Sequence, residues 1–284
     1  MATEFWSTLR RMRGSIVGWS IGLVLYVLLM LAFYDAIAAS EGIEELLASY
    51  PKELLAFFGE LSAIGSPIGY FHYYFFWYMP VVIGILAVGA GASLIVGDEE
   101  RGVLDLVLAH PISRTSLFWG RVLGLCGMLA VLLLVSWLSW WLPSGQTNMG
   151  LSAIEFFRPF LPLFAVLMCF AMLALLLSMV LPGAGAAGML AGAAAVGNFL
   201  LQGLSRMNAD LQRLMKWTLL QYFQGGYAAT GIHWPWLLGL FGCALLFAIA
   251  AWLLFRRRDI RVAGEHGWQL PALHSSRDRE QARR

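Results

Sequence analysis

Two stretches of this chain run for 21 residues without a charged side chain, from Gly14 to Tyr34 and from Val122 to Leu142. A helix needs about 20 apolar residues to cross the hydrocarbon core of a bilayer. Runs of this length, in a chain that is 60% apolar and only 13% charged, exclude an ordinary soluble domain. The first run is too long for a cleaved signal peptide, so we expect it to remain in the membrane.

The charge-free stretches predict an all-α polytopic membrane protein with one transmembrane domain over residues 1–284. The stretch from Pro159 to Ser205 has 47 residues, enough for two spans, and Pro182-Gly183-Ala184-Gly185 predicts the turn between them. We therefore expect six transmembrane helices, at about residues 15–37, 70–96, 118–142, 159–181, 186–205 and 234–255.

The positions of lysine and arginine predict the orientation, because cytoplasmic loops are enriched in these residues. With a cytoplasmic N-terminus, the inner side holds Arg10, Arg11, Arg13, Arg101, Arg114, Arg121, Arg256, Arg257, Arg258, Arg261, Arg277, Arg279, Arg283 and Arg284. The outer side holds Lys52, Arg158, Arg206, Arg213 and Lys216. We therefore expect a multi-pass protein of a bacterial plasma membrane with both termini in the cytoplasm. The net charge of +2 is too small to indicate nucleic acid.

Apolar residues recur with helical spacing in two loops on the expected outer side. Residues 43–61 predict two short amphipathic helices that lie on the membrane face or cap the bundle. A similar pattern, from Leu211 to Leu219, precedes the last span. The tail at residues 264–284 is polar and without apolar period, so we expect a flexible cytoplasmic end.

Aromatic residues are concentrated at the expected outer ends of the spans. The run from Tyr70 to Tyr78 is almost entirely aromatic. Further tryptophans at the same level are Trp137, Trp140, Trp141, Trp234 and Trp236. Because amphipathic rings favour the headgroup region, these residues predict an interfacial belt.

The motifs of a membrane-embedded enzyme are missing from the sequence. The five histidines are far apart and form no metal-binding pair, and the three cysteines lie in apolar runs that favour packing. The phosphate-binding loop needs a lysine followed by Ser or Thr, but Glu53 follows Lys52 and Trp217 follows Lys216. We therefore expect no metal or cofactor on this chain, and nucleotide hydrolysis only in a partner.

Few polar side chains fall within the expected spans. Asp35 and Arg121 lie near span ends, while Asn198 and Gln202 are amides deep in the fifth span. Hydrogen bonding between helices explains these amides as well as substrate contact does. Ion-coupled carriers usually keep ionisable groups at mid-membrane, so the energy source is expected elsewhere.

The loop after the second span, residues 97–114, has the most informative pattern. Asp98, Glu99 and Glu100 precede an apolar stretch that ends at Pro111 and Ser113. Because the helix dipole favours acids in the first turn, we predict that these residues begin a short helix along the cytoplasmic surface. The residues alone fit an ordinary capped interfacial helix equally well.

This loop resembles the signature of ABC-2 type exporter permeases, where an acidic pair, a glycine, a Thr-Leu-Glu-Leu-Leu-like run and Pro-Val-Ser-Arg join the second and third spans. The matching residues are Glu99, Glu100, Gly102, Leu104, Pro111, Ser113 and Arg114. Val103 replaces the usual Thr, and Asp98 the usual Glu. The likeness extends to a basic N-terminal helix, six spans, Phe57-Phe58-Gly59 in the outer loop and the final Phe255-Arg256-Arg257-Arg258-Asp259.

The resemblance implies the permease subunit of an ATP-binding-cassette exporter, with an N-terminal amphipathic helix and this loop as coupling helix. A pair of such subunits, identical or different, would bind two cytoplasmic ATPase subunits that hold ATP and Mg. Closure of the ATPases would push on the N-terminal helix and residues 98–112, and the spans would open outward. The coupling residues implied are Asp98, Glu99, Glu100, Arg101, Gly102, Asp105 and Arg114.

Two other classes of function stay open at this point. One is a membrane anchor or regulatory partner of an ATPase, without transport of its own. The other is a membrane-embedded enzyme.

Small residues dominate the fifth span and predict a close helix contact. Gly188 and Gly192 form a G-x-x-x-G pair on one helical face, which allows two backbones to approach. In related permeases the fifth and second spans lie towards the subunit interface, so we expect this pair in the contact between two permease subunits. Packing within one subunit, against Gly84, Gly89 and Gly91, is the alternative.

Overall fold

The computed structural model describes residues 1–39, 51, 55, 64–104 and 113–257. Throughout this part the regular structure is helical, and no strand is present. Asp105, the 264–284 tail and nearly all of the expected outer-loop helices at residues 43–61 lie outside the described residues.

Six helical segments of the described part are long and apolar enough to cross a membrane, which confirms the all-α polytopic fold. They are α1 (Ala2–Ala38), α4 to α5 (Pro67–Phe71, Met79–Ser93), α8 (Arg114–Ser144), α9 to α10 (Ala153–Phe157, Phe160–Val180), α11 (Ala184–Leu204) and α13 (Trp234–Arg257). A π-helix, η2 (His72–Phe76), connects α4 with α5. Shorter elements are α6 (Val96–Glu100), α12 (Ala209–Met215) and the 3-10 helices η3 (Leu219–Tyr222) and η4 (Gly225–Ala229).

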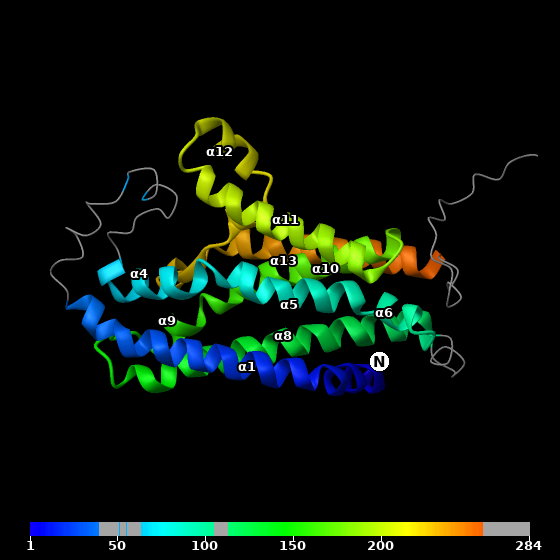
Figure 1. The fold of residues 1–284 in the computed structure, drawn as a ribbon, viewed down its shortest axis with the longest axis horizontal. Coiled ribbons are helices and arrows are strands. Elements are labelled where there is room, and N and C mark those ends of the chain that lie inside the picture. Colours follow the sequence, from blue (N-terminus) through cyan, green and yellow to red (C-terminus); the bar gives the residue numbers. More distant parts are fainter. Residues whose placement is uncertain (40–50, 52–54, 56–63, 105–112, 258–284) are drawn as a thin grey trace, which may run out of the picture.

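The basic N-terminal segment and the first span form one continuous helix. At 1.5 Å per residue, the 37 residues of α1 extend about 55 Å, far more than the bilayer core of about 30 Å. The helix therefore continues beyond the membrane as an N-terminal extension, and this extension runs beside the start of α8 (Figure 1).

The helices run along the long axis of the molecule, with α10 in the interior (Figure 1). α10 is apolar all round and packs against α5, α11 and α13, whereas α1 packs along α8. Small residues allow the closest approaches. A Cβ atom at Gly124 of α8 would lie 2.6 Å from the Cβ of Thr8, and one at Gly91 of α5 would overlap the carbonyl of Ala171 in α10.

The turn between α10 and α11 confirms the helical hairpin expected around Pro182. Because of this turn, α11 begins near the end of the bundle that holds the N-terminus. α6 also lies at this end, and α13 terminates there (Figure 1). We call this the N-terminal end. The opposite end holds α4, α9 and α12 (Figure 1).

The expectation of an interfacial belt at Tyr70–Tyr78 was wrong for most of its residues. Phe71, Phe75 and Phe76 are fully buried, and their rings pack against Phe160 of α10. The α4 and η2 segment turns inward, because α8, α9 and α10 surround it with aromatic rings that exclude lipid. Tyr78, Trp234 and Trp236 are exposed, as an interfacial position requires.

Candidate functional site

Charged residues from three helices meet at the N-terminal end around Asp98 of α6. Its side chain is only 5% exposed. Both carboxylate oxygens accept hydrogen bonds of 2.7 Å from Nη1 of Arg11 in α1, and Oδ2 lies 2.7 Å from Nη2 of Arg121 in α8. Arg101 adds a looser contact of 3.4 Å. Asp98 therefore joins the loop after the second span to the first and third spans.

Arg121 is the most buried cation of this cluster. It also donates to the backbone carbonyl of Leu94, 3.0 Å away, at the end of α5, and its Nε lies 3.9 Å from Glu4 of α1. A buried charge is tolerated only where such partners replace water. Glu4, Asp98 and Arg121 thus form a polar cluster at the boundary of the bundle.

The local backbone explains how Asp98 comes to point inwards. α5 ends at Ser93, and the five-residue α6 follows with Asp98 in its middle. Gly102 has a φ of +69°, a left-handed conformation that favours glycine, and the amide of Val103 donates back to the carbonyl of Asp98. The three acids belong to the short helix α6, with Asp98 and Glu99 in its first turn, and α6 terminates at Glu100. Most of the surface helix expected after them lies outside the described residues.

Glu100 connects the same loop to the fifth span. Its carboxylate accepts a hydrogen bond of 2.8 Å from the backbone amide of Ala184, the first residue of α11. The amides at a helix N-terminus lack partners within the helix, and the dipole there favours a negative charge. Glu100 therefore caps a helix that begins 84 residues further along the chain.

The expected coupling residues divide into two groups. Asp98 and Glu99 are buried, whereas Glu100 and Arg101 are exposed. Arg114 is the first residue of α8, directly after its N-cap Ser113. The sequence pattern overlooked Glu4 and Arg11 as members of the site. Arg121 could have indicated these residues, because a cation inside an apolar helix requires acidic partners.

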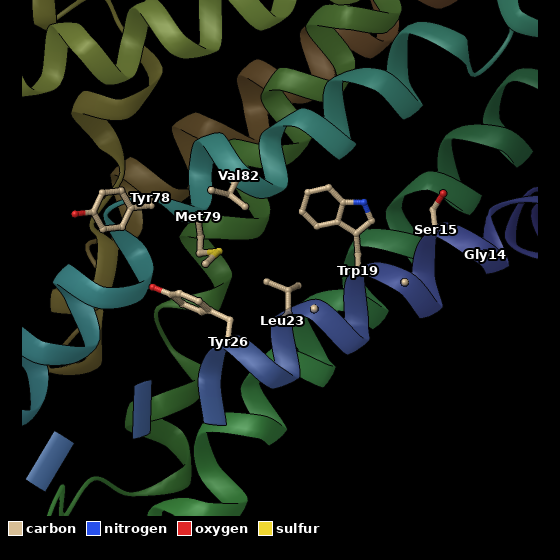
Figure 2. A pocket seen from close by; sticks show the side chains of 10 residues that line it. Gly14, Ser15, Trp19, Leu23, Tyr26, Tyr78, Met79 and Val82 are labelled. Atoms are coloured by element: carbon tan, nitrogen blue, oxygen red, sulfur yellow. The ribbon is translucent and has the colours of Figure 1, made fainter. Parts of the chain in front are cut away.

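A groove of about 950 Å³ separates α1 from α5 (Figure 2). On α1 its wall is formed by Gly14, Ser15, Gly18, Trp19, Gly22, Leu23 and Tyr26. On the other side it is formed by Tyr78, Met79 and Val82. The glycines recur every four residues on one face, and a Cβ atom at any of the three would meet open space. The groove is apolar, with hydroxyl and indole groups at intervals (Figure 2).

Comparison with known proteins identifies the family of this chain. The family model described as ABC-2 family transporter protein matches residues 5–260. The chain belongs to this family. None of the curated proteins compared with it matches significantly. As an ABC-2 transporter it is a multi-pass membrane protein, a member of a family whose membrane components associate with an ABC ATPase and are generally not catalytic themselves.

The glycine pair of the ABC-2 transporter's fifth span lies at the edge of an intrasubunit contact. The buried residues of α11 are Ala187, Ala191, Ala195 and Gly203, and α11 packs against α5. A Cβ atom at Gly188 would lie 3.7 Å from Ala92 of α5, whereas one at Gly192 would meet nothing within 4 Å. Among the described residues, the backbone at Gly192 thus adjoins open space.

The two amides of the fifth span have different surroundings. Asn198 donates to the carbonyl of Ala194 and accepts from the amide of Leu219, so it connects α11 with η3. Gln202 instead lines a polar pocket at the opposite end of the bundle. Hydrogen bonding between helical elements therefore explains Asn198.

Proposed function

We propose that this chain is the permease subunit of an ATP-binding-cassette exporter, coupled to a separate cytoplasmic ATPase that holds ATP and Mg. The observation that carries the proposal is the linkage made by α6. Asp98 bonds to α1 and α8, and Glu100 bonds to α11. A displacement of this segment would act on the first, third and fifth spans together.

The distribution of charge supports a cytoplasmic location for the N-terminal end. Among the described residues this end holds Arg10, Arg11, Arg13, Arg101, Arg114, Arg121, Arg256 and Arg257. The opposite end holds Arg158, Arg206, Arg213 and Lys216. This asymmetry follows the positive-inside rule, and it leaves the exposed Glu100 and Arg101 accessible to a cytoplasmic ATPase.

In this proposal a second permease subunit, identical or different, completes the path for the substrate. The α1 and α5 groove contributes one wall, and the open Gly192 face of α11 contacts the second subunit. ATP-driven closure of the ATPase pair moves α6 and the N-terminal extension of α1. The spans then separate towards the outside, which exposes the groove and releases the substrate.

The experiment is co-expression with a candidate ABC ATPase partner, followed by purification in lipid nanodiscs. Replacing Glu99 and Glu100 by Ala should weaken the association or uncouple ATP hydrolysis from export, with little change in membrane level. Glu100→Gln removes only the negative charge that caps α11, so it tests this contact separately from Glu99. Asp210→Asn, an exposed acid at the opposite end, is the matched control.

Three outcomes separate the alternatives. Loss of coupling in the Glu100 variants, with a normal Asp210 variant, supports the permease. Stable association without ATP-dependent movement of any substrate indicates an anchor or regulator. Export at the wild-type rate in both Glu100 variants would show that residues 98–114 form a capped surface segment without a role in coupling.

A further inference from the structure

A polar pocket of about 420 Å³ lies at the opposite end of the bundle, between the end of α11, α12 and η3. Two cations, Arg206 and Lys216, line it together with the amides Gln202, Gln212 and Gln221, and no carboxylate is among the described residues of its wall. Within the part of the chain that the structure describes, neither cation forms a salt bridge. The pocket therefore has an excess of positive charge and of hydrogen-bond donors.

The pocket is held in shape by contacts outside its polar wall. The guanidinium of Arg206 lies 4.9 Å from the ring centroid of Trp77, a cation–π contact that limits its rotation. Asn198 accepts a hydrogen bond of 3.0 Å from the amide of Leu219 and so positions η3. The floor is apolar and buried, formed by Met215, Leu220 and Phe223.

Exposed apolar residues indicate the depth of the pocket in the membrane. On and beside α12, Leu214 is 57% exposed and Trp217 is 91% exposed. Figure 1 shows α12 projecting from the bundle beyond the end of α11. In a membrane protein, lipid stabilises exposed apolar side chains of this kind, and tryptophan favours the headgroup layer. These residues favour a pocket opening at the level of the lipid headgroups.

We propose that this pocket binds a phosphate group, presented by an anionic lipid headgroup or by a soluble phosphate monoester. Arg206 and Lys216 neutralise the phosphate charge, and the amides donate to its remaining oxygens. A zwitterionic choline headgroup brings a cation towards the same two residues, so phosphatidylglycerol binds more tightly than phosphatidylcholine. The apolar floor accepts the glycerol and the first methylenes. This site is independent of the proposed transport function.

The test uses the full-length chain in phosphatidylcholine nanodiscs with increasing phosphatidylglycerol. Native mass spectrometry counts retained phosphatidylglycerol, and a thermal midpoint measured in pure phosphatidylcholine checks folding. Arg206→Gln/Lys216→Gln should weaken retention at least about tenfold, because two charge-assisted contacts are lost. Lys216→Gln alone, which leaves the Trp77 contact intact, should give a smaller loss. Arg213→Gln removes an exposed cation of α12 that does not line the pocket, and it should bind like wild type.

Competition with glycerol 3-phosphate identifies the source of the phosphate. Displacement of phosphatidylglycerol by this soluble ester assigns the site to phosphate esters in general, and resistance assigns it to the intact lipid. Equal retention by wild type and Lys216→Gln overturns the proposal. An equal loss in Arg213→Gln and Lys216→Gln also overturns it, since the attraction would then be non-specific.

Discussion

Arg121 of the third span and Asp98 of the loop after the second span form an ion pair of 2.7 Å, with side chains only 4% and 5% exposed. Each of these charges is stable there because the other is present. Arg11 approaches the same carboxylate from α1, but its side chain is 37% exposed. The three residues therefore differ in how much the fold depends on them.

Asp98→Ala should destabilise the fold by about 3–5 kcal/mol, because it leaves the buried Arg121 without its main partner. Arg101→Ala removes a longer and exposed contact with the same aspartate and should cost about 1 kcal/mol or less. The measurement is thermal unfolding of the purified chain in one detergent. A double variant, Asp98→Ala/Arg121→Met, should recover part of the loss. Equal midpoints for the two single variants would contradict the buried pair.

Gly18→Leu should block the groove between α1 and α5 and abolish ATP-dependent transport while preserving the fold. The backbone at Gly18 adjoins open space, so the new side chain enters the groove without a clash. Gly239→Leu in α13, also exposed and without neighbours, is the control. Transport should be compared with the level of folded protein. Normal transport by Gly18→Leu would show that the groove is only a lipid-facing depression.

Reporters at the two termini should both read cytoplasmic, and one placed after Gln146 should read outside. The structure supports this placement, because Met1 and the end of α13 lie at one end of the bundle and Gln146 follows α8 at the other (Figure 1). Enzyme fusions that are active on one side of the membrane provide the measurement. With the N-terminus in the cytoplasm, a C-terminus outside the cell would be incompatible with six spans.

Gly192→Leu should reduce cross-linking between two permease subunits, since its bulk separates helices that meet at the open face of α11. A cysteine at the exposed Met189 provides the cross-link, after replacement of Cys126, Cys169 and Cys243. Gly197→Leu, on another face of the same helix, serves as the control. Unchanged cross-linking and export in the Gly192 variant would place the subunit interface elsewhere.

The charged cluster around Asp98 could be predicted only in part from the sequence. The 97–114 pattern located the loop correctly, because acids, a glycine and a proline in that order are visible along the chain. It did not predict the inward direction of Asp98, since that direction depends on Arg11 and Arg121. Those cations lie 87 positions before Asp98 and 23 positions after it.

The sequence by itself determined the six spans, the helical hairpin around Pro182 and the family resemblance. Bilayer thickness makes uninterrupted apolar length a sufficient signal for a span. Only the tertiary structure decided which faces of those spans meet. In the tertiary structure Phe71, Phe75 and Phe76 are buried, and Gly91 and Gly124 lie at close helix contacts. Gly18 and Gly192 adjoin open space. In helices that are apolar on nearly every face, hydropathy cannot distinguish lipid from protein, so packing alone makes that choice.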